Sequence, residues 1–300
     1  MQNNNNDVRC ILTSYRRYCL GELIREAKLQ KGWCGFRMPY FRKFSNSKFK
    51  EINIEEAFSK LNNVEELDLE EAFGLVKRLL GSKNSDIVSK SMDFLMKFDD
   101  DKVISMLIEL SKRRSILIKC EAIERMSLFP VNSVIQTLVK TIRDKNSLVR
   151  ICSAESLGVI KAKEAVQVLR EALLDEDRLA RGYAAEALGQ IGDKGSRELI
   201  SEALRRERRN DAKVRYYYAL YMLDNNDEYI LKILQMFNSK SYQVRCAAAN
   251  LLSDLINKDN LKLIKRRISL IYKKEKTPAV RYSLENLIGS IKLYDQREST

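Results

Sequence analysis

The chain has 300 residues, carries 54 Lys and Arg against 41 Asp and Glu, and contains no histidine. Without histidine there is no usual general base, no imidazole zinc ligand and no Ser/His or Cys/His nucleophilic pair, so most hydrolase mechanisms are excluded. The formal charge of +13 would attract polyanions, namely nucleic acid, anionic lipid or an acidic protein surface.

Only three prolines and eleven glycines interrupt the chain, a composition typical of long helical runs and therefore of an all-α protein. No apolar run reaches the roughly 18 residues that cross a bilayer, and no cleavable leader pattern opens the sequence. We therefore expect a cytoplasmic protein. The six cysteines show no CxxC spacing, so we expect reduced thiols, no bound metal and no cofactor.

Residues 1–50 form a basic segment with eleven Lys and Arg against three acidic residues. Apolar positions from Val8 to Ala27 trace one face of a helix that starts near Asp7 and stops near Gly32. Basic and aromatic residues then interleave over 33–44, a stretch that includes Trp33, Arg42 and Lys43.

Such interleaving could stack on bases while it neutralises phosphates. The alternative, which we favour, is a cap on the first repeat of the following domain. A basic amphipathic helix can also lie on a membrane surface. Residues 51–83 follow as a divergent helix pair over 52–62 and 64–81, which we also interpret as a cap.

Residues 84–300 contain an internal repeat with a spacing of 30 to 36 residues, which indicates a repeat architecture. A Val, Ile or Ala starts each unit and is followed in most units by a basic residue; the seven starts are Val88, Ile118, Val149, Ala180, Val214, Val244 and Val280. Three residues before each start stands a residue type that caps helix N-termini, which predicts the caps Ser85, Ser115, Asn146, Asp177, Asp211, Ser241 and Thr277.

Each unit continues as two helical stretches. In the first, small and apolar residues recur at helical spacing, as in Ala184, Ala185 and Leu188. A second periodic stretch follows, as in Leu199, Ile200 and Ala203. The pattern predicts a helical hairpin per unit, with a closing half-repeat that ends near Ile291 and a loose tail over 292–300.

The stretch 177–193 resembles the short bacterial HEAT repeat, which is also found in phycobilisome-lyase-like proteins. The similarity extends over about 84–291 and weakens where Ser89 replaces the basic residue and where Tyr216, Tyr217 and Tyr218 replace the alanine step. The resemblance implies a right-handed α-solenoid of about seven HEAT-like hairpins whose second helices line the concave side. It implies no particular activity.

Basic residues crowd the second helices, so we expect a positive groove along the concave side. The alternative is a solvated face, since Lys and Arg favour helix C-termini. The residues that we assign to partner binding are Arg113, Arg114, Arg205, Arg206, Arg208, Arg209, Lys262, Lys265, Arg266, Arg267 and Tyr217, together with Trp33, Arg42 and Lys43 of the N-terminal segment.

The basic residue of each start has a different predicted role. Arg150, Arg181, Arg215, Arg245 and Arg281 stand at one fixed place per repeat, where they can bond acidic or carbonyl groups of an adjacent unit and form a ladder. The tyrosines of 216–221 predict a locally enlarged core. Asp99, Asp100 and Asp101 precede a helix, where carboxylates are favourable without any metal.

Three functions follow from these patterns. Our leading hypothesis is a non-catalytic adaptor that binds an acidic protein surface or peptide. The second is a nucleic-acid-binding solenoid; HEAT-like glycosylases would make this an enzyme, but they imply tryptophans that face a lesion, and the repeat region contains none. The third, a chromophore lyase, has no support beyond the repeat.

Overall fold

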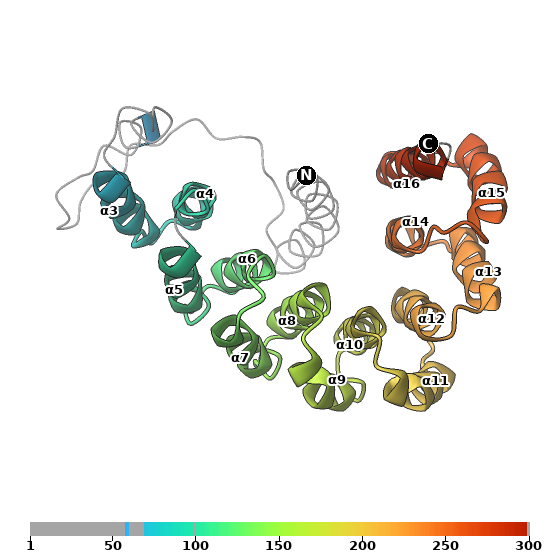
Figure 1. The fold of residues 1–300 in the computed structure, drawn as a ribbon, viewed down its shortest axis with the longest axis horizontal. Helices are drawn as coiled ribbons and strands as arrows, with labels where there is room; N and C mark the ends of the chain where they lie inside the picture. Colours follow the sequence, from blue (N-terminus) through green and yellow to red (C-terminus); the bar gives the residue numbers. More distant parts are fainter. Residues whose placement is uncertain (1–57, 60–68, 99, 299–300) are drawn as a thin grey trace. The chain divides into compact units, whose positions relative to one another are not determined.

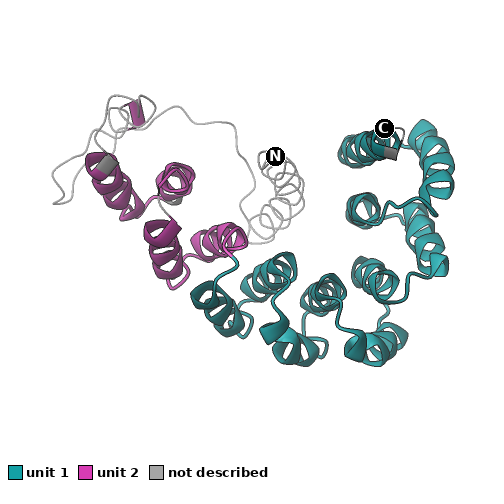
Figure 2. Cartoon of the chain, viewed as in Figure 1, with its two compact units in different colours: residues 1–24, 130–300 teal, residues 25–129 magenta. Residues whose placement is uncertain are grey.

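A computed structural model describes residues 58–59, 69–98 and 100–298. Over these residues the predicted all-α class is confirmed, with fourteen α-helices and no strand. Trp33, Arg42 and Lys43 lie outside the described residues, as do residues 51–57 and 60–68 of the predicted cap. The described residues divide into two compact units (Figure 2): those up to residue 129 form one, and those from residue 130 form the other.

The first of these, here the short unit, contains four described helices in two pairs. Successive helices pack against each other within each pair, and α4 also packs on α6. Apolar residues such as Val88, Leu95 and Leu107 are fully buried between them. The helices are α3 (Leu69–Leu80), α4 (Ser85–Leu95), α5 (Asp100–Leu110) and α6 (Ile116–Met126).

The second, here the long unit, alternates two kinds of helix. The helices that carry the Val-Arg or Ala-Arg start, here the Val-Arg helices, are α8 (Ser147–Ile160), α10 (Arg178–Ile191), α12 (Asn210–Asp224), α14 (Tyr242–Asp254) and α16 (Pro278–Glu298). The helices between them, here the outer helices, are α7 (Asn132–Thr141), α9 (Val166–Ala172), α11 (Arg197–Arg206), α13 (Asp227–Gln235) and α15 (Leu261–Lys274).

Successive Val-Arg helices pack extensively on one another. Most outer helices pack chiefly on the Val-Arg helix that follows them, while α13 packs more on α12, which precedes it. Figure 1 shows the long unit as an arc with the Val-Arg helices in its inner row. Each repeat is therefore best defined as an outer helix followed by a Val-Arg helix, whereas the sequence pattern predicted the Val-Arg helix as the first of the two. The expectation that the basic second helices line the concave side is wrong in this unit, because those helices form the outer row.

The end of the chain also differs from the prediction. The helix that starts at Pro278 continues to Glu298 and packs on α15 and α14. Its buried residues reach Ile291 and include Leu284 and Leu287. The last unit is thus a complete helix pair, and the predicted half-repeat with a tail from residue 292 is wrong.

Most of the predicted caps stand at helix N-termini. The side chain of Asn146 accepts a hydrogen bond from the Leu148 amide at 3.0 Å, and that of Asp177 accepts one from the Leu179 amide at 2.8 Å. Ser115 accepts one from Ile118 at 3.5 Å.

Two of the predicted caps are wrong. Asn84 rather than Ser85 caps α4, by accepting the Asp86 amide at 2.9 Å. Helix α12 begins at Asn210, so Asp211 lies inside its first turn. At Ser241 the residue occupies the cap position, but its hydroxyl donates to the Gln243 side chain.

Small residues let the inner row pack closely. A Cβ on Gly189 would lie 2.6 Å from the Cα of Ala219, and one on Gly158 would lie 2.8 Å from the Cα of Ala187. Real Cβ atoms do not approach backbone so closely, so α8, α10 and α12 meet almost backbone to backbone. Gly192 ends α10 at φ 78°, the left-handed conformation that glycine adopts without strain.

Candidate partner-binding surface

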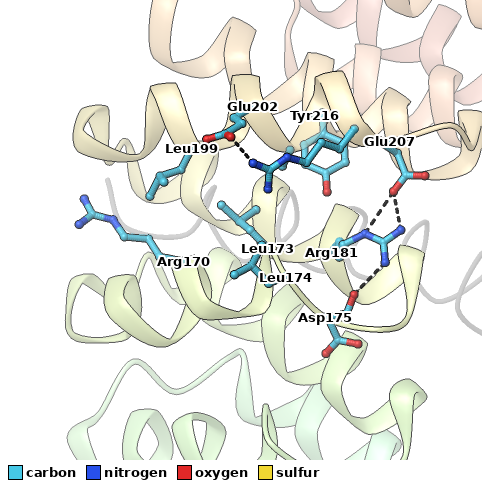
Figure 3. Close-up of a pocket in the computed structure, with 11 residues that line it drawn as sticks. Arg170, Leu173, Leu174, Asp175, Arg181, Leu199, Glu202, Glu207 and Tyr216 are labelled. Carbon is cyan, nitrogen blue, oxygen red and sulfur yellow. Dashed lines mark hydrogen bonds and ion pairs between the residues drawn. The ribbon is translucent and has the colours of Figure 1, made fainter.

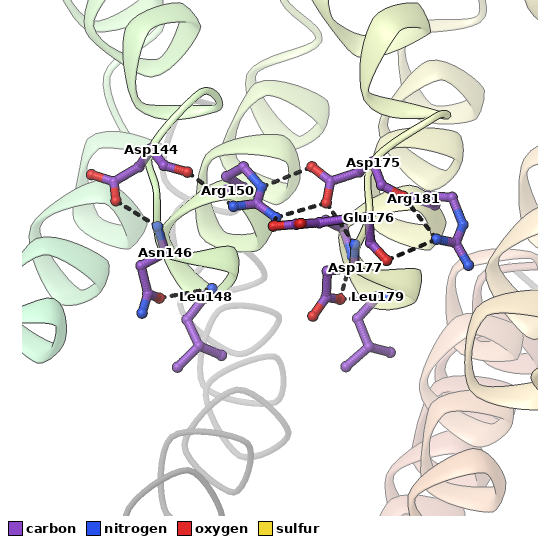
Figure 4. A network of polar contacts seen from close by, with 10 residues as sticks. Asp144, Asn146, Leu148, Arg150, Asp175, Glu176, Asp177, Leu179 and Arg181 are labelled. Atoms are coloured by element: carbon purple, nitrogen blue, oxygen red, sulfur yellow. Dashed lines mark hydrogen bonds and ion pairs between the residues drawn. The ribbon is translucent and has the colours of Figure 1, made fainter.

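An arginine ladder joins successive repeats at the loops that lead into the Val-Arg helices (Figure 4). Arg150 donates from Nε and Nη2 to the Asp175 carboxylate, both at 2.7 Å, and from Nη1 to the Asp144 carbonyl at 3.0 Å. Arg181 of the next repeat donates to the Asp175 carbonyl at 2.7 Å. Asp175 therefore holds two successive arginines, one through its side chain and one through its backbone.

The same arrangement continues at Glu207. Arg181 donates to its carboxylate at 2.7 and 3.2 Å, and the amides of Arg208 and Arg209 donate to the other oxygen at 2.9 and 3.0 Å. Burial alone would raise the pKa of Glu207, but these hydrogen bonds lower it below the ordinary value. Glu207 is a buried carboxylate that stays ionised because it is fully bonded.

The ladder resumes near the end of the chain. Arg245 donates to the Glu275 carboxylate at 2.8 Å, and Arg281 donates to the Glu275 carbonyl at 3.1 Å. Burial opposes the ionisation of Glu275, but the amide of Thr277 and the Arg245 guanidinium lower its pKa. The structural role predicted for these recurrent arginines is confirmed.

Arg215 takes a different place. Its Nη1 bonds the carboxylate of Glu186 in the preceding repeat, and its guanidinium lies 3.5 Å from the centre of the Tyr183 ring. Burial would lower the pKa of Arg215, but electrostatic interactions with Tyr183 and Glu186 raise it. Both members of the pair are buried, so Arg215 ties α12 to α10 within the inner row.

The predicted enlarged core is also present. Tyr216, Tyr218 and Tyr221 are buried, and the Tyr221 hydroxyl accepts hydrogen bonds from Asn257 at 2.7 Å and from Asn260 at 2.8 Å. Tyr217, which we assigned to partner binding, is partly buried against the same core, and burial raises its pKa. Its ring offers a partner only a limited area.

The arginines at the end of α11 are exposed. Within the part of the chain that the structure describes, the side chains of Arg205, Arg208 and Arg209 have no ion pair, whereas Arg206 pairs with Glu202 of the same helix. Four cations therefore lie within five residues, and three of them are available to an anionic partner.

Helix α15 carries a second exposed basic surface. Lys262, Arg266 and Arg267 are exposed and lack an ion pair among the described residues, while Lys265 pairs with Asp295. None of the fourteen residues of α15 is acidic. The same helix and the residues just beyond it add three more exposed cations with no ion pair in the described part of the chain, Lys273, Lys274 and Lys276.

The remaining assigned residues lie in the short unit. Arg114 is exposed in the turn after α5, and Arg113 is partly buried, with its Nη1 3.5 Å from the Ser82 carbonyl. Within the long unit, the assigned residues gather in two clusters, one at the end of α11 and one along α15.

A shallow groove of about 460 Å³ lies between α9 and α11 (Figure 3). Its apolar lining includes Leu174, which is 76% exposed, and Leu199, which is 45% exposed. The charges around it neutralise one another, since Arg181 pairs with Glu207 and other arginines of the lining have acidic partners. The groove is thus an apolar surface without a free charge, in contrast to the two exposed clusters.

The described residues contain no group of three Cys, Asp or Glu side chains that could hold a metal ion. None of the described helices is long and apolar enough to span a membrane. Cys120, Cys152 and Cys246 are buried in the core.

Comparison with known families gives matches to repeat models over three stretches. Residues 107–189 match HEAT repeats, residues 180–206 match a PBS lyase HEAT-like repeat, and residues 230–258 match a single HEAT repeat. No curated protein sequence matches the chain.

Solved structures with a similar fold include the complex of CpcE and CpcF of phycocyanin lyase from Nostoc sp., with 15% identity and a TM-score of 0.54 over 84% of this chain and 100% of that one. Human deoxyhypusine hydroxylase shares 16% identity over 74% of this chain and 85% of its own, with a TM-score of 0.42. Importin beta shares 14% identity over 79% of this chain and 39% of its own, with a TM-score of 0.45. At these identities the similarity shows the fold alone.

Proposed function

Because the chain is built from HEAT repeats, a fold typical of protein-interaction scaffolds, we propose that it is a non-catalytic adaptor that binds an acidic segment of another protein. The binding surface is formed by the exposed cations of the outer helices α11 and α15. It is not the inner row, where Arg215 and Glu186 already neutralise each other.

The observation that carries this proposal is the division between paired and unpaired arginines. Arg150, Arg181 and Arg245 are held by carboxylates of the next repeat. By contrast, no carboxylate among the described residues pairs with the other cations at the end of α11 and along α15, namely Arg205, Arg208, Arg209, Lys262, Arg266, Arg267, Lys273 and Lys274. The fold thus uses one set of arginines to join repeats and leaves another set available to an external anion.

The positions of the unpaired cations support a shared edge. Consecutive helices of such a repeat run antiparallel, so the C-terminal ends of α11 and α15 point to the same edge of the long unit. Arg205, Arg208 and Arg209 stand at the first end, and Lys273 and Lys274 at the second. An extended acidic segment along this edge would reach both clusters.

A protein partner fits this surface better than nucleic acid does. Single-stranded nucleic acid is usually gripped by cations interleaved with exposed aromatic rings. On α15 the one aromatic residue, Tyr272, lies under the Arg281 guanidinium at 4.2 Å and donates its hydroxyl to Glu285. The CpcE and CpcF structure, a complex of two chains, is an example of this fold in a protein assembly.

The proposal is tested with two triple variants, Arg205→Gln with Arg208→Gln and Arg209→Gln, and Arg267→Gln with Lys273→Gln and Lys274→Gln. A control triple, Lys163→Gln with Lys194→Gln and Lys258→Gln, removes the same charge from exposed positions before or at the start of outer helices, at the opposite edge. The probe is a fluorescein-labelled, glutamate-rich peptide of about 20 residues, followed by anisotropy.

Exposed ion pairs contribute about 0.2 to 1 kcal/mol each, so each test triple should weaken binding roughly ten-fold and the control at most two-fold. Equal losses in all three variants would show that only net charge matters and would refute a defined surface. Tighter binding of a single-stranded DNA of equal charge would favour the nucleic-acid hypothesis instead.

A further inference from the structure

Helix α15 presents one exposed apolar residue in the middle of its basic surface. Leu270 is 51% exposed, whereas Ile264 and Ile268 on the opposite side are fully buried. The buried stripe also includes the partly buried Ile271, which packs on the core cluster of the long unit. Leu270 therefore does not belong to the core, although it lies within an apolar run of the sequence.

The four helical neighbours of Leu270 are all cations. Residues three and four positions away lie beside a given residue on a helix surface, and for Leu270 these are Arg266, Arg267, Lys273 and Lys274. All four are exposed and have no ion pair in the described part of the chain. Glu275, the acidic residue that follows the helix, is held by Arg245.

We propose that this surface, Leu270 within its ring of four cations, recognises an acidic protein segment that carries an aliphatic side chain between carboxylates. The inference rests on the proposed function and identifies the chemistry of the partner at α15. The carboxylates would pair with the four cations, and the aliphatic side chain would cover Leu270 and remove it from water.

Other polyanions match this surface less well. A phosphate backbone has no apolar group that could cover a leucine at the centre of the contact. An anionic membrane takes up a helix through an apolar stripe, and the exposed side of α15 has a single large apolar residue. The central leucine is thus the feature that selects a protein segment.

The test uses two labelled helix-forming peptides in an alanine background. One has a central leucine with glutamates three and four residues away on both sides, and the other has serine in place of that leucine. The protein variants are Leu270→Ser, which leaves every charge in place, and Arg266→Gln with Lys273→Gln. Leu293→Ser is the matched control, because Leu293 is similarly exposed, at 57%, on α16.

The full chain should bind the leucine peptide about ten-fold more tightly than the serine peptide, as expected for the burial of one leucine. Leu270→Ser should remove that preference and leave the salt-dependent binding of both peptides, whereas Leu293→Ser should preserve it. The charge variant should weaken both peptides.

Equal binding of the two peptides by the full chain would overturn this inference alone, because the acidic partner would then be bound through charge only. Failure of both peptides to bind would overturn it together with the proposed function. Tighter binding of phosphatidylserine vesicles or of single-stranded DNA than of the leucine peptide would overturn it in favour of those ligands.

Discussion

Replacement of Arg181 by alanine should open the arginine ladder at its most buried carboxylate. The change removes two hydrogen bonds to Glu207, at 2.7 and 3.2 Å, and one to the Asp175 carbonyl, at 2.7 Å. The Glu207 side chain is only 3% exposed and would keep its charge without its cation.

Loss of one partner of a buried ion pair costs about 3 to 5 kcal/mol. The Arg181 side chain is 25% exposed, and Glu207 keeps the amides of Arg208 and Arg209, so the expected loss of unfolding free energy is about 2 to 3 kcal/mol. Arg178→Ala is the matched control on the same helix. Its pair with Asp211 is 42% and 22% exposed, so the loss should stay below about 1 kcal/mol.

Urea denaturation followed by circular dichroism compares the two variants. Because repeat arrays can unfold in parts, hydrogen exchange at the Arg208 and Arg209 amides gives the local measurement. Both amides should lose protection in Arg181→Ala, and Glu207→Gln added to that variant should recover part of the stability. Similar losses in Arg181→Ala and Arg178→Ala would refute the structural role of the ladder.

Three further predictions concern single side chains. The pKa of Glu207 is lowered in the folded protein, so the ionised carboxylate stabilises the fold above the unfolded pKa of about 4.5, and this stabilisation is lost as pH falls through the folded pKa. In urea titrations, the difference in unfolding free energy between the natural chain and Glu207→Gln should therefore shrink from pH 7 to pH 3. Burial raises the pKa of Tyr216 to about 12, and its hydroxyl makes no hydrogen bond of normal geometry. Tyr216→Phe should therefore be neutral or stabilise the protein by about 1 kcal/mol. A large fall in the unfolding temperature would contradict this. Gly189→Ala should destabilise the protein by about 1 to 3 kcal/mol because the new Cβ would meet Ala219. Gly289→Ala should stabilise it by about 0.5 to 1 kcal/mol, because a Cβ there meets no atom of another element within 4 Å. The reverse order in urea denaturation would show that the inner row is not closely packed.

Sequence patterns predict the helices of this protein well, because each Val-Arg start combines a capping residue with a stripe of alanine and leucine. The same patterns do not determine how to cut the repeat. A series of alternating helices can be divided before or after the Val-Arg helix, and only the packing of α9 on α10 or of α11 on α12 shows which division is correct. Because the repeat was divided before the Val-Arg helix, the basic helices were predicted to line the concave side, whereas they form the outer row.

Smaller errors have equally local causes. Asn84 and Ser85 are adjacent and both can cap a helix, so the pattern does not separate them. Helix α12 starts early enough to enclose Asp211, and Arg215 pairs with Glu186 of the neighbouring Val-Arg helix instead of with a loop carboxylate.

Leu270 was missed as a surface residue because it lies in an apolar run. Its spacing could have revealed it, since Ile264, Ile268 and Ile271 complete the buried stripe without it. Which cations lack a partner cannot be derived from one sequence, because the partner acids come from loops about 25 to 30 residues away.

Binding of an acidic protein segment by the cations of the outer helices can be mapped residue by residue. The experiment is lysine acetylation followed by mass spectrometry, with and without the leucine-centred acidic peptide. We expect protection of Lys273 and Lys274 beside Leu270, with unchanged modification of Lys163 and Lys194 at the opposite edge. Protection centred on Lys213 of the inner helix α12, or spread evenly over all lysines, would contradict it.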